Sequence, residues 1–399
     1  MKVVYSEECL LHDPPYEVTR GKVQAYVESP ARLKSIKQFI DSQPDDFSVI
    51  SPQDYSLAPI LDVHDDDFVK FLSTIYDDWV AAGLPSAAAI GETFAHMSTL
   101  SKIDPAIYKM NAQLTPSARV GLYTLDMSVS YMKDTWRAAY ASVQVALTAA
   151  HTLLKSQSSS IYALCRPPGH HASCNLAAGY CFINNVAVVT RFLQNYSVEE
   201  MDAMAKTFNS QSIINVASIL ESGSSKKNSE NHALQKKKKI MIVDIDYHHG
   251  NGTQDIFYDD PSILYISLHG HPDYPFFTGS AEERGRGQGE GYNINIPLNP
   301  ATTDDAVYLD HLTRVLQSET AVNFNADTVI VSMGLDTWWQ DPIAGMKGLK
   351  DEETYTKMGR LFKTAPSCQG RPILFVQEGG YTVDMLGKLA GNILQGYIR

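Results

Sequence analysis

Five short segments of the chain consist almost entirely of apolar residues, and longer segments of mixed polarity separate them. The apolar segments cover residues 160–165, 240–246, 262–268, 327–333 and 372–377, with a shorter one at 2–5. Apolar runs of this length, rich in Val and Ile, predict strands that are buried on both faces of a parallel sheet.

The intervening segments are compatible with helices. They cover residues 30–42, 65–82, 128–156, 184–195, 303–322, 352–364 and 383–397. Strands that alternate with helices predict a mostly parallel, multi-stranded sheet with helices on both faces. The sequence has no repeat of fixed period, so one α/β domain over residues 1–399 is the economical interpretation.

Two regions depart from this alternation. Residues 84–125 carry scattered Gly, Pro, Ser and Met with little sustained period, and we predict an irregular excursion over the rim of the functional site or into a subunit contact. The second half of residues 197–239, ESGSSKKNSENHALQKKKK, is polar and predicts a mobile surface insertion. Its six lysines fit a nuclear address or a patch for an anionic partner. A solvated loop that leads into the strand at 240 is the simpler interpretation.

Charge and cysteine content narrow the function classes. The formal net charge of −12 argues against a broad basic face for nucleic acid and would suit a cationic ligand. The five cysteines form no CxxC pair, which favours free thiols in a reducing compartment. The sequence shows no signal peptide and no apolar run of transmembrane length. We therefore expect a soluble cytoplasmic protein, with the nucleus as the alternative, and no membrane or direct nucleic-acid partner.

Polar residues that suit catalysis or metal binding cluster where four predicted strands end. These clusters are RPPGHHA after 160–165, DIDYHHGNG at the end of 240–246, GLDTWWQDP after 327–333 and QEGGY at the end of 372–377. In open α/β sheets, ligands bind beyond the carboxyl ends of the strands. We therefore expect the four clusters to meet in one site.

Asp246, His248 and Asp336 are candidate metal ligands. Alternate residues of an extended backbone project to the same side, so Asp246 and His248 can face one ion. With Asp336 they offer one nitrogen and two oxygens, and three protein ligands with one open position are typical of catalytic zinc. The same set suits Fe²⁺, Co²⁺ or Mn²⁺. Taken alone, the Asp-x-His pair also fits a capping aspartate and a core histidine.

The adjacent His170 and His171 suit general acid–base work, although an extended backbone would point their rings in opposite directions. Asp244 and Asn251 are candidate orienting partners, and an anion beside one ring with a neutral group beside the other would set the two pKa values apart. Tyr381 follows two glycines. Its hydroxyl can stabilise an oxyanion, but a tyrosine that packs under the sheet explains the segment equally well.

Together these segments resemble the histone deacetylase and acetylpolyamine amidohydrolase superfamily, whose fold is shared with arginase. The matching strings are VHDDDFVKFL, CRPPGHHA, AGYCFINN, VDIDYHHGNGTQDIFY, SLHG, GYNINIPL, GLDTWWQDPI and QEGGY. They follow the family order between about residues 2 and 397. Within the superfamily, the YHHGNGTQDIFY and DTxxQDPI strings are most similar to acetylpolyamine amidohydrolases and class II deacetylases.

The resemblance implies a role for each position. It implies zinc ligation by Asp246, His248 and Asp336, and catalysis by His170, His171 and Tyr381, supported by Asp244, Asn251 and Arg32. It places Gly179, Tyr180, Tyr274 and Gly379 along a substrate tunnel, with Phe276 and Phe277 as fallback candidates for the second wall. It implies a structural potassium ion at Asp244, Asp246, His248, Ser267 and Leu268, and a second monovalent ion at Phe257, Asp260, Ile263 and Tyr292.

The implied activity is zinc-dependent hydrolysis of the amide of an acetylated amine, either acetyl-lysine in protein or an acetylpolyamine, to free amine and acetate. A catalytically silent scaffold that binds acyl-lysine is disfavoured because the implied ligands and Tyr381 are intact. A ureohydrolase of the same fold would need two metals, and Trp338 stands where an extra ligand would be wanted. Family analogy also implies a homodimer through residues 84–125.

Departures from the family pattern concern the substrate. Polyamine-specific members place acids in the long loop that precedes the helix expected from residue 128, but here residues 101–123 of that loop hold one acid, Asp104, against Lys102, Lys109 and Arg119. A polycationic substrate would meet little attraction there unless Asp126 or Asp273 supplies it. Tyr274 stands where the family usually has phenylalanine, which adds a hydroxyl at the rim.

Overall fold

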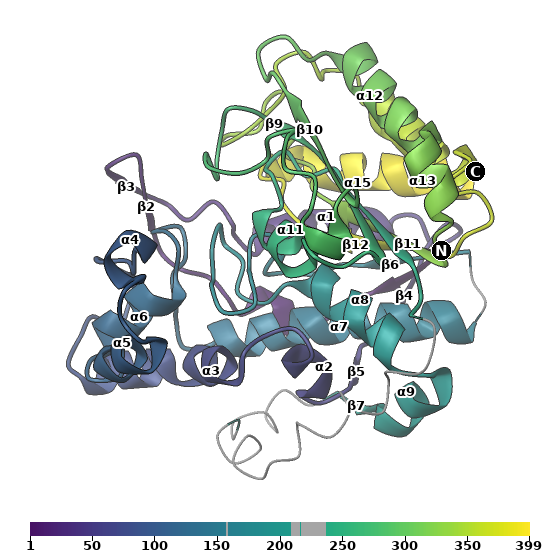
Figure 1. The fold of residues 1–399 in the computed structure, drawn as a ribbon. Coiled ribbons are helices and arrows are strands. Elements are labelled where there is room, and N and C mark those ends of the chain that lie inside the picture. The colour runs from purple at the N-terminus through teal and green to yellow at the C-terminus, as the bar shows by residue number, and fades with distance from the viewer. Residues whose placement is uncertain (157–158, 209–215, 217–236) are drawn as a thin grey trace.

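A parallel sheet of eight strands forms the centre of the computed structural model, which describes residues 1–156, 159–208, 216 and 237–399 (Figure 1). The strand order is β10-β9-β8-β11-β12-β6-β1-β4, and every neighbouring pair is parallel. The strands are β1 (Lys2–Val4), β4 (Ser48–Ile50), β6 (Ser160–Ala163), β8 (Ile240–Asp244), β9 (Ile263–Gly270), β10 (Asn293–Leu298), β11 (Thr328–Met333) and β12 (Ile373–Gln377). This architecture confirms the predicted α/β class.

Two small antiparallel pairs lie outside the central sheet. They are β2 (Glu17–Thr19) with β3 (Lys22–Gln24), and β5 (Gln53–Asp54) with β7 (Lys206–Thr207). The described α-helices are α1 (Ala31–Asp41), α2 (Ala58–Leu61), α3 (Asp66–Ala81), α4 (Met97–Leu100), α5 (Pro105–Ala112), α6 (Pro116–Tyr123), α7 (Thr135–Lys155), α8 (Asn185–Asn195), α9 (Val198–Met204), α11 (Asn251–Phe257), α12 (Asp305–Gln317), α13 (Glu319–Phe324), α14 (Glu353–Thr364) and α15 (Val383–Ile398). In the described part of the chain, no helix is both long and apolar enough to cross a membrane.

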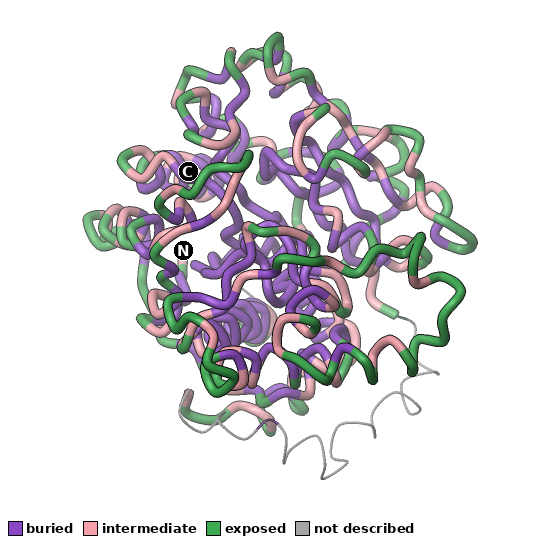
Figure 2. Tube along the Cα trace, turned by 90° about the vertical axis from the view of Figure 1, so that its left-hand side faces the viewer, coloured by how far each residue is buried: buried purple, intermediate pink, exposed green. Residues whose placement is uncertain are grey.

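Helices cover both faces of the sheet. The long helix α7 contacts β1, β6 and β12 and packs against α8, whereas α15 packs against α1 and α14. Phe375 of β12 contacts Phe362 of α14 and Tyr397 of α15 through its ring. The buried positions therefore fill the interior around the strands, and exposed positions lie on the outer loops and helix faces (Figure 2).

The apolar pattern predicted the inner strands but not the edges of the sheet. Strands β4 and β10 carry polar side chains at alternate or exposed positions, and they form the two ends of the strand order. An edge strand has one neighbour and one partly open side, so it lacks the continuous apolar run that identified the inner strands.

Two predicted helices have different limits in the structure. The segment 128–156 becomes helical only at Thr135, because the backbone of Tyr131 exchanges hydrogen bonds with that of Ala89 instead. The segment 303–322 contains two helices, α12 and α13. Ser318 separates them, and its hydroxyl accepts a hydrogen bond from the Ala321 amide at the start of α13.

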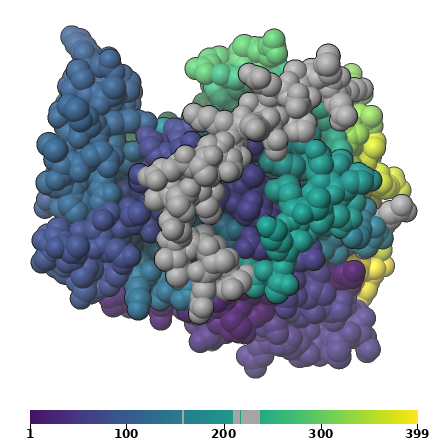
Figure 3. Space-filling view, turned by 90° about the horizontal axis from the view of Figure 1, so that it is seen from below, coloured from purple at the N-terminus to yellow at the C-terminus, as the bar shows by residue number. Residues whose placement is uncertain are grey.

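Residues 84–125 are not irregular as predicted, since they hold α4, α5 and α6. Helices α5 and α6 begin with Pro105 and Pro116, and the side chains of Asp104 and Thr115 accept hydrogen bonds from amides of their first turns. An Asp or Thr followed by proline is a helix-start signal. The prediction missed these helices because each is too short to show a sustained helical period. The region forms a lobe, blue in Figure 3, that projects at one side of the molecule.

The predicted insertion at 197–239 is only partly described. Its first half forms α9, with a capping box between Ser197 and Glu200, followed by β7. Most of the polar half, including three of its six lysines, lies outside the described residues.

Candidate active site

Loops that follow four adjacent strands meet at the carboxyl ends of these strands. Parallel pairing aligns Asp244 of β8 with Ser332 of β11, Met333 of β11 with Gln377 of β12, and Val376 of β12 with Ala163 of β6. The carboxyl ends of these strands therefore lie side by side, and the residues that come next in each loop are brought together.

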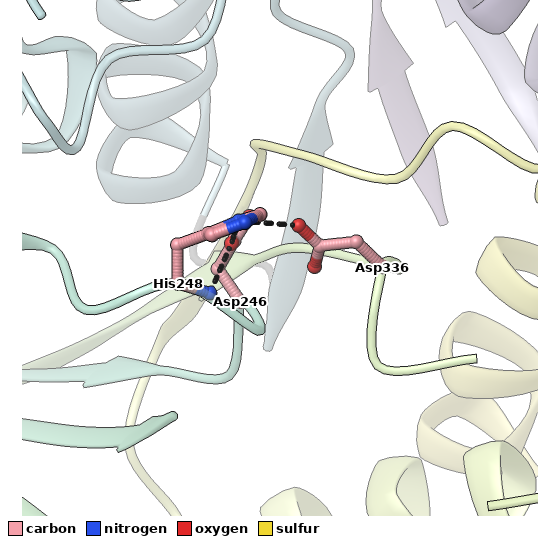
Figure 4. A group of neighbouring side chains, drawn as sticks. All are labelled: Asp246, His248 and Asp336. Carbon is pink, nitrogen blue, oxygen red and sulfur yellow. Dashed lines mark hydrogen bonds and ion pairs between the residues drawn. The ribbon is translucent and has the colours of Figure 1, made fainter. Parts of the chain in front are cut away.

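The metal-ligand candidates Asp246, His248 and Asp336 converge, with ligand atoms that all lie within 4.8 Å of one another. His248 Nδ1 lies 3.0 Å from a carboxylate oxygen of Asp336 and 3.4 Å from one of Asp246, as the dashed lines in Figure 4 mark for this group. Strand β8 ends at Asp244, so Asp246 and His248 share a bend rather than the extended backbone we predicted. The His248 amide donates to Asp246 Oδ1 over 2.9 Å, which fixes this bend.

Backbone amides hold both carboxylates. The Tyr247 amide donates to Asp336 Oδ1 over 2.8 Å, and the Gly379 amide donates to Asp246 Oδ2 over 2.8 Å. A Cβ atom at Gly379 would lie 2.6 Å from the Asp246 carboxylate and 2.7 Å from that of Asp336, so only glycine fits there.

The donor set fits a divalent cation. Burial and the neighbouring Asp246 carboxylate raise the pKa of Asp336 to about 6. Burial lowers the pKa of His248, but the carboxylates of Asp246 and Asp336 outweigh it and raise that pKa to about 10. Two buried carboxylates this close repel each other unless a positive charge lies between them, which a protonated His248 or a bound metal supplies. One imidazole and two carboxylates without a thiolate suit zinc or another first-row metal.

His170 and His171 lie beside this group, with ring centroids 4.0 Å apart. Their backbone turns, since the Ala172 amide bonds to the Gly169 carbonyl, and the two rings therefore do not point in opposite directions. His170 Nδ1 lies 3.1 Å from Asp244 Oδ2, and His171 Nδ1 lies 2.7 Å from Asn251 Oδ1. Each predicted orienting partner is thus in contact with one histidine.

The pKa values of the two histidines are shifted in opposite directions, because His170 has a charged partner and His171 a neutral one. Burial disfavours the charged form of His170, but the carboxylates of Asp246 and Asp244 outweigh burial and raise its pKa to about 10. Burial, followed by the positive charges of His170 and His248, lowers the pKa of His171 well below its usual range. The pair therefore contains one proton-rich and one proton-poor imidazole.

The loop that carries Tyr381 is held from both sides. Arg32 donates from Nε to the Gly380 carbonyl over 2.5 Å and from Nη2 to the Glu378 carbonyl over 2.6 Å. Its guanidinium carbon lies 4.8 Å from the centre of the Tyr381 ring. On the other side, the Tyr381 amide donates to Asp341 Oδ2 over 2.8 Å. Arg32 therefore lies beneath the candidate site and touches the tyrosine directly.

Sequence reasoning missed the buried ion network behind Arg32. Glu28 Oε1 accepts hydrogen bonds from Arg32 Nη1 and from Arg166 Nε, the latter over 2.9 Å, and all three side chains are completely buried. Arg166 directly precedes the Pro-Pro-Gly turn that leads to His170. The sequence signal for Glu28 was only its position four residues before Arg32, and because Glu28 precedes α1, the turn before the helix brings the two side chains together.

Tyr180, Tyr381 and Tyr26 form a small apolar cluster of their own. Tyr274 lies across from them, and its ring centroid is 4.9 Å from that of His171 and 5.9 Å from that of His248. The fallback candidates Phe276 and Phe277 are 63% and 93% exposed. Tyr274, and not these two phenylalanines, therefore lies against the histidines.

Gly179 stands between the two wall residues. A side chain there would collide with the His171 ring and approach the Tyr274 hydroxyl to 2.9 Å. Its backbone has φ +49°, and Tyr180 has φ 66°, so both residues adopt the left-handed conformation. This backbone shape directs Tyr180 toward Tyr381, whose ring centroid lies 5.7 Å away.

Some of the residues expected at the two monovalent-ion sites are neighbours in the structure. Asp244 pairs with Ser267 in adjacent strands, and Leu268 follows Ser267 in β9. Phe257 ends α11, and the Asp260 amide donates to its carbonyl over 3.0 Å. The Asp260 carboxylate already forms an ion pair with the Arg191 guanidinium at 2.6 Å. An ion at this site would therefore be bound by backbone carbonyls. Both ion sites stay predictions.

Comparison with known proteins covers nearly the whole chain. The family model of the histone deacetylase domain matches residues 26–202 and 230–397. Acetylpolyamine amidohydrolase 1 of Pseudomonas aeruginosa is 34% identical over 100% of this chain and 99% of its own, and acetylpolyamine amidohydrolase of Mycoplana ramosa is 33% identical over 99% of each. Among solved structures, acetylpolyamine aminohydrolase from Burkholderia pseudomallei superposes with a TM-score of 0.79 at 27% identity, covering 100% of this chain and 98% of that one.

Proposed function

Because this chain belongs to the histone deacetylase domain family, we propose that it is a zinc-dependent deacetylase that hydrolyses the amide of an acetylated amine. The observation that carries the proposal is the contact between the Asp246, His248 and Asp336 group and the His170–His171 pair, with all five side chains buried at one edge of the sheet. The products would be a free amine and acetate.

In this proposal, Asp246, His248 and Asp336 hold the zinc. When bound, zinc supplies Lewis-acid polarisation of a carbonyl and lowers the pKa of a water molecule. His171, kept neutral by burial and oriented by Asn251, accepts a proton from the attacking water. His170, kept protonated by Asp244 and Asp246, donates a proton to the departing amine nitrogen.

Tyr381 completes the set as a neutral hydrogen-bond donor. Burial raises the pKa of its phenol well above the usual range, so the hydroxyl keeps its proton. A donor held rigidly where negative charge develops stabilises the oxyanion of a tetrahedral intermediate. Arg32 and Asp341 fix the backbone on either side of the tyrosine and thereby its position.

A direct assay tests the proposal. The purified protein is analysed for bound metal and then assayed with a fluorogenic acetyl-lysine peptide, N-acetylputrescine and N-acetylspermidine. We expect about one zinc per chain and turnover of at least one substrate, lost on chelation and restored by zinc. No turnover of any of them with zinc, iron or cobalt supplied would contradict the proposed function.

The assembly and surroundings of the enzyme are part of the same proposal. We propose a homodimer through the lobe at 84–125, because Met97, Ile107, Met110 and Leu114 are exposed there. A monomeric mass in light scattering would exclude it. We also propose a cytoplasmic location, which the five free cysteines support. We further propose that potassium binds at the two predicted monovalent-ion sites, and the dependence of the melting temperature on potassium concentration tests this.

A further inference from the structure

Two carboxylates near the candidate site accept hydrogen bonds from tyrosine hydroxyls. Tyr274 donates to Asp126 Oδ2 over 2.6 Å, and Tyr247 donates to Asp273 Oδ2 over 2.9 Å. These are the two acids that the sequence left as sources of attraction for a cationic substrate. In the structure, each of these carboxylates therefore already accepts a hydrogen bond from a tyrosine hydroxyl.

The acceptor positions of Asp126 are filled. Oδ1 accepts from the Ser128 amide over 2.9 Å and from the Ser128 hydroxyl. Oδ2 accepts from the Tyr274 hydroxyl and from the Gly179 amide over 3.3 Å. A carboxylate has about four lone-pair positions. Asp126 therefore has none left for a substrate ammonium group.

These hydrogen bonds connect Asp126 to both walls of the candidate tunnel. One runs to Tyr274, whose ring lies edge-on against His171. The other runs to Gly179, the residue before Tyr180. Among the four groups that donate to Asp126, the Tyr274 hydroxyl belongs to the side chain that contacts the catalytic histidines. Removal of this hydroxyl leaves the amides of Ser128 and Gly179 as donors.

The length of the substrate decides which group reaches this carboxylate. In acetyl-lysine, four methylene groups separate the amide nitrogen from Cα. In N-acetylputrescine, four methylene groups separate the amide nitrogen from an ammonium group. With the acetyl group at the metal-ligand candidates, the ammonium of putrescine occupies the place of the lysine Cα, at the outer end of the walls.

We propose that Tyr274 is a specificity-determining residue, and that its hydroxyl withholds Asp126 from the substrate so that acyl amines without a nearby positive charge are favoured. The inference rests on the proposed function and names its substrate class, acetyl-lysine within a peptide chain rather than a free acetylpolyamine. A phenylalanine at this position leaves Asp126 with an open acceptor site that an ammonium group can use.

The test is the ratio of kcat/KM for N-acetylputrescine to that for N-pentylacetamide, a pair that differs in an ammonium group against a methyl group. We expect Tyr274→Phe to raise this ratio by roughly tenfold, the gain typical of one charge-assisted hydrogen bond near a surface. Tyr397→Phe is the matched control, since its hydroxyl donates to Ser159 at the opposite edge of the sheet, and the ratio should not change. In an Asp126→Asn background, Tyr274→Phe should no longer raise the ratio.

Binding gives a second measurement that does not require turnover. Calorimetry on the metal-free proteins should show tighter binding of N-acetylputrescine by the Tyr274→Phe variant and unchanged binding of N-pentylacetamide. A ratio within threefold of the wild type would overturn the proposal, as would a rise that persists in the Asp126→Asn background. If the wild-type enzyme with zinc hydrolyses no acetylated amine, the proposed function fails instead, so the two failures are distinguishable.

Discussion

The candidate site has a floor, formed by the metal-ligand candidates and the histidine pair, and a mouth, formed by Tyr274, Asp126 and the two neighbouring phenylalanines. Both regions contain aromatic and acidic side chains, but they differ in burial. On the floor, side chains from four loops are buried and each has a partner from another loop, as His170 has Asp244 and His171 has Asn251. At the mouth, Tyr274 and Asp126 are half-buried, and Phe276 and Phe277 are largely exposed.

This difference separates chemistry from selectivity. Buried charges without water must be neutralised by neighbours, so the floor tolerates little change in charge or shape. At the mouth, solvent replaces lost partners at small cost, so a substitution there redirects binding more than it impairs the reaction. Substitutions on the floor should therefore cost more activity or stability than substitutions at the mouth.

Asp336→Asn should have the largest effect. It removes one negative charge from the metal-ligand candidates while keeping the shape of the side chain, and Lewis-acid stabilisation worth several kcal/mol should be lost with the metal. We expect kcat/KM to fall roughly 10³-fold or more, with zinc content well below one per chain by mass spectrometry. A variant with full metal content and wild-type activity would contradict the assignment of Asp336.

Tyr381→Phe should act on the rate alone. Loss of one oxyanion donor costs roughly 10²–10³ in kcat, whereas bound zinc and melting temperature should stay as in the wild type, because the hydroxyl is no ligand. If this variant also lost its metal, the tyrosine would have a structural role instead.

Glu28→Gln should reveal the cost of an unpaired buried charge. The substitution leaves the buried guanidinium groups of Arg32 and Arg166 without their shared carboxylate, and breaking such a pair costs roughly 3–5 kcal/mol of unfolding free energy. Chemical denaturation measures this loss. The matched control is Asp41→Asn, which breaks the exposed pair with Lys37 and should cost less than about 1 kcal/mol.

Phe277→Ser should have the smallest effect. Its side chain is 93% exposed, and surface substitutions usually change the unfolding free energy by less than about 0.5 kcal/mol. We expect kcat/KM for small acetylated amines to stay within about twofold. A large loss would mean that the mouth takes part in catalysis and that the contrast with the floor is wrong.

Much of this molecule follows from local sequence patterns. Continuous apolar runs identify the inner strands because strands buried on both faces need them. The helices with a clear apolar stripe, such as α1, α3 and α8, match their predicted limits to within one residue at each end. The strand-end clusters also pointed to Asp246, His248, Asp336 and the histidine pair, since parallel pairing leaves those loops nowhere else to meet.

The tertiary structure decided what depends on contacts between distant segments. The open edge strands, the turn that brings the two histidine rings together, and the carboxylate of Glu28 shared by two arginines have no local pattern that determines them. The same holds for the hydrogen bond from Tyr274 to Asp126, which joins residues 148 positions apart. Sequence determines which groups are available at the strand ends. Only folding determines which of their charges and lone pairs are already used by the protein, and therefore what remains for a substrate.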